Sequence, residues 1–533
     1  MFVPFKLSRG VLKTFAPPIP QAYAWAAKYV PTIERPLLDM AQGSPGYPPS
    51  KDLLDALSLA ALQPSSSRYS SVLGDVPLRR LLAKDMEIVY GEGTEIVAGD
   101  IALTAGCNLA FVAAVMSLAD AGDEVILPTP WMTLDLLGVQ TVSLPTNAAE
   151  GFLPSVEECA KLITPKTKAI ALVSPNNPTG AIYPPALLAS FAKLAHSHNL
   201  ALILDETYRD FILDSSPHGL FAAPSMPPWR DYLVHLFSFS KSYAIPGFRL
   251  GSIAAIPAFL KHAETALDCL QICPPRVPQI ALATNDLLPA LRPSIRTNSL
   301  AIAARHDLFR RSLPSTWFIG SQGGYYAFVR HPFDGVKSDA VCQRLAEEMG
   351  VVSLPDRFFS NSEVGEVVDA GKWIRFSVAN VDDEQITRII KSLPVSEIYA
   401  GIVQIEMTLQ IEICSQGSFS SEGLLMKRPE SSNCAETGFD AATDTVDLSS
   451  QTTLSWLTRI VDAMRPFGAI ERENALQSRT LLSEFQLLDY IFDVAFSTLT
   501  AGSLVSRTWS TICRPHVFRT LSLSCQNADA RLS

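Results

Sequence analysis

The chain has 533 residues and a formal net charge of −10, with 47% hydrophobic and 18% charged residues. This balance is typical of a globular protein with two or three well-buried domains, and it excludes a largely disordered chain. The acidic charge argues against a nucleic-acid partner, because nucleic-acid binding needs a basic face. The nine cysteines show no zinc-binding spacing, so no metal site is expected, and their odd number favours reduced, intracellular thiols. No apolar stretch reaches the ~20 residues of a transmembrane helix, so no membrane association is expected.

Residues 1–45 are interpreted as an N-terminal arm. The first 33 residues are basic and lack acidic side chains, as mitochondrial presequences do. They also contain five prolines, which break the amphipathic helix that such a signal needs. We therefore favour a cytoplasmic location over a mitochondrial one.

Beyond the arm, the apolar patterns predict an α/β protein with a mainly parallel sheet. Strand-like runs alternate with helix-like patterns between residues 101 and 256, as in a parallel α/β core. A long helix is expected from residue 291 towards residue 311, followed by a smaller α+β region. The further helices are expected at 52–62, 76–90, 185–198, 339–349 and 383–393, and the later strands at 323–329, 351–354 and 374–378.

Three polar motifs follow the strand patterns of the core. Lys241 lies in Ser-Phe-Ser-Lys-Ser-Tyr (238–243), eight positions before Arg249. A lysine among hydroxyl side chains can form a Schiff base with a cofactor aldehyde, while serines and an arginine hold a phosphate. Ser-Pro-Asn-Asn-Pro-Thr-Gly (174–180) and Asp-Glu-Thr-Tyr (205–208) each follow a buried apolar run. Ligand chemistry in α/β sheets lies where such strands end.

These motifs, in this order, resemble the class I/II aminotransferases of the fold-type-I pyridoxal-phosphate enzymes. The resemblance covers about residues 20–395. It implies a large cofactor-binding domain (46–290) and a small domain (291–394, with parts of the arm). It also implies an L-amino acid and a 2-oxo acid as substrates, and a homodimer.

The resemblance implies specific roles for the motif residues. Lys241 would carry the cofactor and move the Cα proton of the substrate, and Asp205 would pair with the pyridine nitrogen. Asn177 and Tyr208 would donate hydrogen bonds to the 3-oxygen of the ring. The phosphate contacts would be Ser238, Arg249, Gly106, Cys107 and Asn108, together with Tyr69 of the neighbouring subunit.

The substrate side of the site is implied by two further segments. Arg375, in Trp-Ile-Arg-Phe-Ser (373–377), would bind the substrate α-carboxylate, and Gly43 would lie on a loop that covers the substrate. Tyr23, Tyr47 and Tyr325 would give an aromatic pocket, which suggests an amino donor such as tyrosine. No second arginine stands out for a dicarboxylic substrate, although Arg276 and Arg296 are candidates.

One segment departs from the family pattern. The aromatic residue that stacks on the cofactor is expected after the strand at 123–127, but the loop at 128–138 is about five residues short beside Trp131. Trp131 is the candidate replacement. A misplaced exon boundary in the gene model would produce the same shortened sequence.

Residues 395–533 are foreign to the family. Residues 395–470 read as a flexible Ser/Thr-rich linker. Residues 471–533 resemble a degenerate fungal F-box, which would bind a ubiquitin-ligase adaptor through apolar helices. An apolar helical tail, or translated sequence of an adjacent gene, would look the same.

Three functions follow from these readings. The leading one is a pyridoxal-phosphate aminotransferase with ping-pong chemistry, which places the chain in amino acid or secondary metabolism. A carbon–sulfur lyase on the same scaffold needs the same lysine, aspartate and arginine. A non-catalytic F-box adaptor with an aminotransferase-like domain has no chemical need for all of them.

Overall fold

The computed structural model describes residues 5–14, 17–130, 134–214, 216–359 and 371–393 of the chain, with two short strands further on. The chain divides into two compact units, residues 1–395 and 396–533. In the second unit, β14 (Ser418–Phe419) pairs antiparallel with β15 (Met426–Lys427). The other residues of the expected linker and F-box-like tail lie outside the described residues.

The first unit is built on a seven-stranded sheet with the order β2-β8-β7-β6-β5-β3-β4. Its neighbouring strands are parallel except for β8, which runs antiparallel to β2 and β7. The strands are β2 (Ile101–Thr104), β3 (Glu124–Thr129), β4 (Gln140–Pro145), β5 (Thr167–Val173), β6 (Ala201–Asp205), β7 (Leu233–Ser238) and β8 (Gly251–Ala254). The predicted α/β fold with a mainly parallel large sheet is thus confirmed.

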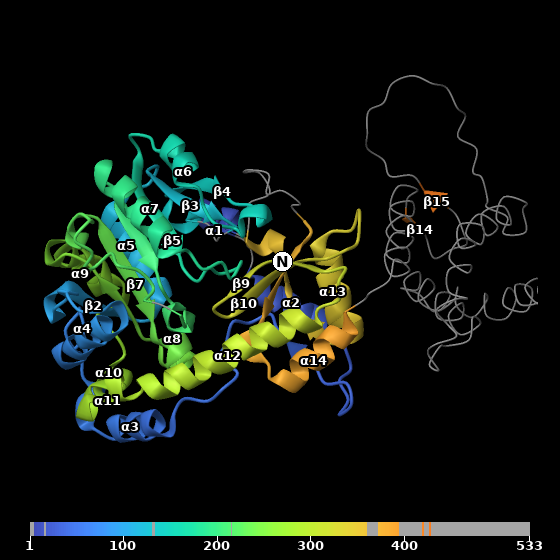
Figure 1. Ribbon diagram of the computed structural model, residues 1–533, viewed down its shortest axis with the longest axis horizontal. Coiled ribbons are helices and arrows are strands. Elements are labelled where there is room, and N and C mark those ends of the chain that lie inside the picture. The colour runs from blue at the N-terminus through green and yellow to red at the C-terminus, as the bar shows by residue number, and fades with distance from the viewer. Residues whose placement is uncertain are drawn as a thin grey trace, which may run out of the picture. The chain divides into compact units, whose positions relative to one another are not determined.

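Helices cover both faces of this sheet, which explains why its strands are apolar without alternation (Figure 1). Along β5, Ile170 and Leu172 point into one core, whereas Ala169 and Ala171 point into the other. The first core contains side chains of α3 (Lys51–Ala61), α4 (Val76–Tyr90), α6 (Val156–Leu162), α7 (Pro185–Ser197) and α10 (Arg276–Ala283), and the second those of α5 (Cys107–Leu118) and α9 (Pro257–Gln271).

A smaller antiparallel sheet with the order β12-β13-β10-β9 follows in the chain. Its strands are β9 (Phe318–Gly323), β10 (Tyr326–Arg330), β12 (Leu354–Pro355) and β13 (Trp373–Ser377). The long helix α12 (Arg292–Ser312) runs from α11 (Leu287–Ala290) beside the large sheet to α14 (Asp383–Ser392) beside the small one (Figure 1). The two sheets are therefore joined by a rigid element.

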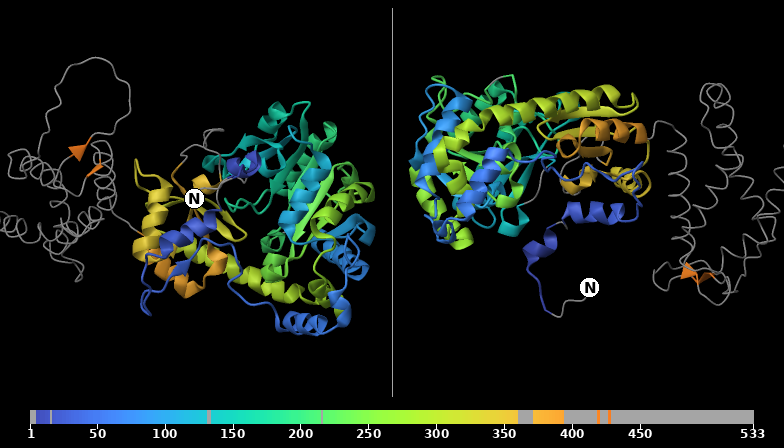
Figure 2. Two further views of the ribbon diagram at one scale, coloured as in Figure 1. Left: turned by 180° about the vertical axis from the view of Figure 1, so that it is seen from behind. Right: turned by 90° about the horizontal axis from the view of Figure 1, so that it is seen from below.

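Two elements of the N-terminal arm pack beside the small sheet. Helix α2 (Pro18–Ala26) lies against α13 (Ser338–Met349), and both views of Figure 2 show it in dark blue beside the yellow elements. Strand β1 (Leu38–Asp39) pairs in parallel with β11 (Val351–Val352). This pairing places the loop that contains Gly43 next to β13, because Met40 O accepts a hydrogen bond from Ser377 N.

Most expected elements are confirmed to within two residues, including the helix at 76–90, found as α4, and the long helix, found as α12. The expected strand at 323–329 is wrong in its first part. Gly324 adopts φ +54° and turns the chain between β9 and β10. None of the described helices has the length and apolar character needed to span a membrane.

Candidate active site

The ends of three adjacent strands bring the sequence motifs together. Strands β5, β6 and β7 are parallel, so their carboxyl ends lie at the same edge of the sheet. Asn177, Asp205 and Lys241 therefore lie at this edge. Lys241 lies in the one-turn helix α8 (Phe239–Ser242), directly after β7. Ser238 caps this helix by accepting a hydrogen bond from the amide of Ser240 at 3.2 Å. This is the edge at which parallel α/β sheets bind ligands.

The amine of Lys241 is enclosed by the loop of Gly43 and by aromatic rings. Its Nζ donates a hydrogen bond to Gly43 O at 2.5 Å and lies 5.9 Å from the ring centre of Tyr208 and 5.8 Å from that of Tyr325. Burial, with the positive charges of Arg375 and Arg249, lowers the pKa of Lys241. A lowered pKa increases the fraction of neutral amine, which is the form that acts as a nucleophile or base.

Asp205 is an oriented carboxylate in a buried environment. The amide and hydroxyl of Thr207 donate to Oδ1 at 2.9 and 2.7 Å. Burial raises the pKa of Asp205, although hydrogen bonds from Thr207 and from the thiol of Cys107 oppose this. Burial also raises the pKa of Cys107, so its thiol stays a donor. A protonated ring nitrogen would favour the charged carboxylate of Asp205 and so oppose this effect of burial.

A cradle for an anion lies at the start of α5. Gly106 precedes the helix with φ +88°, and a Cβ there would lie only 2.2 Å from Nη2 of Arg249. Arg249 itself has φ +50°, and its Nη1 donates to Pro246 O at 3.1 Å. Asn108, on the first turn of α5, is exposed. The N-terminus of α5, the guanidinium of Arg249 and the absence of a side chain at Gly106 together fit a phosphate group.

Arg375 extends from β13 toward the edge of the large sheet. Its Nη1 donates to Asn177 Oδ1 at 2.8 Å, and its Nη2 donates to Ala41 O. The guanidinium carbon lies 4.4 Å from the ring centre of Tyr326 and 4.8 Å from that of Phe359. Burial lowers the pKa of Arg375, and its Nε has no hydrogen-bond partner among the described residues. A buried, oriented guanidinium with an unused donor suits a carboxylate ligand.

Four tyrosines surround Lys241, of which sequence reasoning missed Tyr326. The hydroxyls of Tyr47 and Tyr325 lie 3.1 Å apart, and they donate to Lys241 O at 3.2 and 3.1 Å respectively. The hydroxyls of Tyr208 and Tyr326 lie 2.8 Å apart. Strand periodicity would send adjacent tyrosines to opposite faces, but the turn at Gly324 lets Tyr325 reach the site as well.

Several other sequence candidates make no hydrogen bond or ion pair with these groups in the described part of the chain and have surroundings of their own. The side chain of Tyr69 is exposed, with a relative accessibility of 76%. The Tyr23 hydroxyl donates to Asp39, at 2.7 Å. Arg276 pairs with Asp75, and Arg296 donates to Leu213 O. Trp131 lies outside the described residues.

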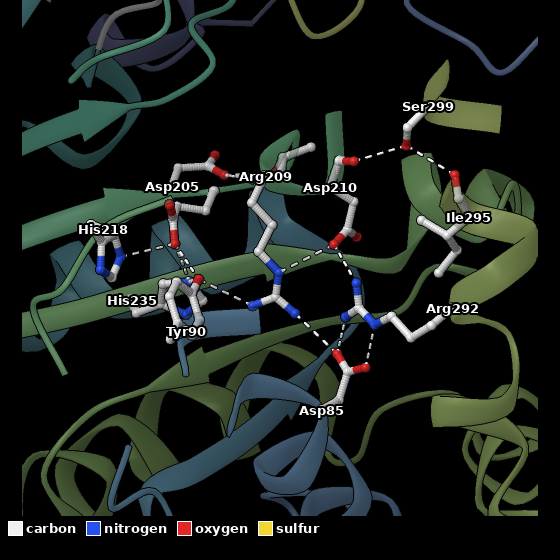
Figure 3. Close-up of polar contacts among 12 residues, drawn as sticks. Asp85, Tyr90, Asp205, Arg209, Asp210, His218, His235, Arg292, Ile295 and Ser299 are labelled. Carbon is white, nitrogen blue, oxygen red and sulfur yellow. Dashed lines mark hydrogen bonds and ion pairs between the residues drawn. The ribbon is translucent and has the colours of Figure 1, made fainter. Parts of the chain in front are cut away.

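A buried ionic network begins at Glu206, next to Asp205, and sequence reasoning missed it as well (Figure 3). Glu206 is fully buried, and its Oε2 accepts from the ring nitrogens of His218 and His235, at 3.1 and 3.0 Å, and from Tyr90. The neighbouring histidines lower the pKa of Glu206, despite burial, which alone would raise it. Burial lowers the pKa of His235 to about 4.

The same network continues to helix α12. Arg209 donates to Tyr90 and to Asp85, at 3.2 Å in both cases. Arg292, at the start of α12, donates to Asp85 and to Asp210, the latter at 2.5 Å. Buried charges need such partners. Because Glu206, Arg209 and Asp210 are fixed in this way, the network also fixes the segment between them, which includes Tyr208.

The chain is similar in sequence to known aminotransferases. The arginine–pyruvate transaminase of Pseudomonas aeruginosa is 30% identical over 340 residues, which cover 62% of this chain and 84% of that protein. An aromatic aminotransferase of Arabidopsis thaliana is 26% identical, over 66% of this chain and 88% of that protein.

Solved structures show the same fold. The aspartate aminotransferase of Thermus thermophilus with maleate gives a TM-score of 0.61 at 24% identity, covering 73% of this chain and 98% of that one. An aromatic aminotransferase of Pyrococcus horikoshii gives 0.59 at 24% identity, covering 70% and 97%. Residues 35–393, about two thirds of the chain, match the aminotransferase class I and II family. The fold, the residues at the sheet edge and this match together make the chain a member of the class I and II aminotransferases, enzymes that depend on pyridoxal phosphate.

Proposed function

We propose that this aminotransferase moves the amino group of an aromatic L-amino acid, such as tyrosine, to a 2-oxo acid such as 2-oxoglutarate by a ping-pong mechanism. The observation that carries the proposal is the placement of Arg375 beside Asn177, at the sheet edge that also carries Lys241. An amino acid held by its carboxylate there would present its Cα to the amine of Lys241.

The residues at the sheet edge divide the work of binding and proton transfer. When bound, pyridoxal phosphate supplies an aldehyde and an electron-withdrawing pyridine ring. Asp205 would hold the ring nitrogen in its protonated form, and Asn177 and Tyr208 would donate to the 3-oxygen. Ser238, Arg249 and the amides at Gly106, Cys107 and Asn108 would hold the phosphate.

Lys241 would act twice in each half-reaction. Its neutral amine would first take the proton from the substrate Cα and then deliver a proton at the neighbouring carbon of the cofactor. The lowered pKa of Lys241 favours this exchange, because a base works best when its pKa is near the working pH. The loop of Gly43, whose carbonyl contacts Nζ, would cover the substrate and keep water from the reacting atoms.

The aromatic donor is supported by the side chains around Lys241. Tyr47, Tyr208, Tyr325 and Tyr326 present rings there, whereas the contacts of Arg276 and Arg296 are with Asp75 and with a backbone carbonyl. The second carboxylate of aspartate would be buried without a partner, which costs several kcal/mol.

A panel of amino donors with 2-oxoglutarate tests this proposal. Tyrosine or phenylalanine should exceed aspartate in kcat/KM by at least ~10²-fold, because about 1.4 kcal/mol corresponds to a factor of ten. Arg375→Lys should lower kcat/KM for every donor together, since it weakens a contact that all donors share. Equal values for aspartate and tyrosine would contradict the aromatic preference.

A further inference from the structure

Tyr326, the first residue of β10, contacts three separate parts of the site and is itself 2% exposed. Its hydroxyl oxygen lies 2.8 Å from that of Tyr208. The guanidinium carbon of Arg375 lies 4.4 Å from the centre of its ring. A Cβ added to Gly43 would lie 1.8 Å from the hydroxyl oxygen, so the loop that bonds Lys241 closes directly over Tyr326.

We propose that Tyr326 is a positioning residue whose hydroxyl and ring have separate tasks. The hydroxyl donates to Tyr208 and directs the Tyr208 proton toward the 3-oxygen of the bound cofactor. The ring holds the guanidinium of Arg375 in the orientation that receives the substrate carboxylate. The inference rests on the roles proposed above for Tyr208 and Arg375.

The direction of the hydrogen bond between the two tyrosines follows from counting protons. Each phenol carries one proton, so only one of the two hydroxyls donates across the 2.8 Å contact. Burial raises the pKa of Tyr208 well above its ordinary value, so its hydroxyl keeps its proton. If Tyr208 uses that proton to donate a hydrogen bond to the cofactor oxygen, then Tyr326 must be the donor in the hydrogen bond between the two tyrosines.

A hydrogen bond from Tyr326 to the Tyr208 hydroxyl would strengthen the hydrogen bond that Tyr208 donates to the cofactor oxygen. Donation by Tyr326 polarises the Tyr208 hydroxyl, and cooperative chains of this kind strengthen each bond where the local dielectric is low. Tyr326 is buried, and the space beside its hydroxyl is filled by the Gly43 loop. The chain of two hydroxyls would therefore stabilise the negative charge on the cofactor oxygen more than Tyr208 alone.

The ring of Tyr326 acts on a different group. Two contacts to oxygen hold the ends of the Arg375 guanidinium, namely Asn177 Oδ1 and Ala41 O. The ring centres of Tyr326 and Phe359 lie 4.4 and 4.8 Å from its central carbon, so both rings pack against the guanidinium. A guanidinium over an aromatic face is attracted by the ring quadrupole.

Two substitutions separate the two tasks. Tyr326→Phe removes the hydroxyl and keeps the ring, whereas Tyr326→Leu removes both. Tyr183→Phe is the matched control, because Tyr183 is also buried and its hydroxyl bonds to the side chain of Asn176 at 3.4 Å. Each full-length variant is loaded with pyridoxal phosphate, its folding is checked by circular dichroism, and its visible absorption is titrated against pH.

Tyr326→Phe should raise the apparent pKa of the cofactor absorption band by about half a unit to one unit, since the oxygen anion loses support. Its KM for amino donors should stay near the wild-type value while kcat falls. Tyr326→Leu should in addition raise KM for every donor about tenfold, because Arg375 loses one stacked face. Tyr183→Phe should titrate as wild type does.

A titration of Tyr326→Phe that superimposes on wild type would overturn the role of the hydroxyl. An unchanged KM in Tyr326→Leu would overturn the role of the ring. Failure of the proposed function gives a different result, because the wild-type protein itself would then show no conversion of its absorption band by an aromatic amino acid.

Discussion

Arg375 and Asn177 are 198 positions apart in the chain, yet Nη1 of the arginine donates to Oδ1 of the asparagine at 2.8 Å. The contact joins β13 of the small sheet to the loop after β5 of the large sheet. The group that would bind the substrate carboxylate is thereby tied to a group that would bind the cofactor ring. A fixed distance between them lets the Cα–H bond stand perpendicular to the ring, where its electrons delocalise.

Asp205→Asn should slow Cα deprotonation by about 10²–10³-fold while the cofactor still binds. The amide oxygen can still accept from Thr207, but the negative charge that keeps the ring nitrogen protonated is lost. Stopped-flow absorption of the half-reaction with tyrosine measures this step. Asp214→Asn, at an exposed position, is the control, and a half-reaction near the wild-type rate in Asp205→Asn would refute the pairing.

Tyr69 is expected to complete the phosphate site of a second copy of the chain. Its side chain is exposed in the single chain, so a second copy of the chain has access to it. Lys241→Ala should be inactive, and Tyr69→Ala should be weakened at limiting cofactor. A refolded mixture of the two should regain activity, because one site in each mixed dimer then has both wild-type residues. No gain over the separate variants, or a monomer in sedimentation, would contradict a shared site.

Stability should fall between pH 7 and pH 5 through buried histidines. Burial lowers the pKa of His235, His306 and His331 to about 4, against about 6.5 in an unfolded chain. Because the folded pKa is depressed, the stabilisation is complete above about pH 6.5 and is lost as the pH falls toward 4, by up to about 1.4 kcal/mol per pH unit and histidine.

Urea unfolding at several pH values measures this effect. His306→Gln should flatten the dependence, since the amide can still donate to Gly324 O, as His306 does at 3.1 Å, but does not titrate. His262→Gln, at an exposed position, should leave the slope unchanged. A midpoint independent of pH over this range would contradict the prediction.

The sequence predicts those parts of the site that follow strand ends. Asn177, Asp205 and Lys241 each come directly after an apolar run, and parallel strands bring such positions to one edge. Gly106 and Arg249 could be paired only through a family pattern, because nothing local indicates that their atoms approach each other.

The residues missed by sequence reasoning act through tertiary contacts. Glu206 and Arg209 look like ordinary loop charges, and only the fold shows that His218, His235 and Asp85 are buried against them. The sequence predicts one continuous strand from residue 323, in which Tyr325 and Tyr326 would point to opposite faces. The chain turns at Gly324 instead, so Tyr326 was not predicted at the site. Patterns in a single sequence indicate hydrophobic periodicity and secondary-structure propensity, but they do not indicate which distant side chains contact each other.

The most direct test of the account is the chemical identity of the lysine that carries the cofactor. The protein is loaded with pyridoxal phosphate, reduced with borohydride, digested and mapped by mass spectrometry. We predict a phosphopyridoxyl group on Lys241, and none on Lys241→Ala, because the Lys241 amine is buried at the sheet edge and its pKa is lowered. Label on another lysine, or none on the wild-type protein, would contradict the account.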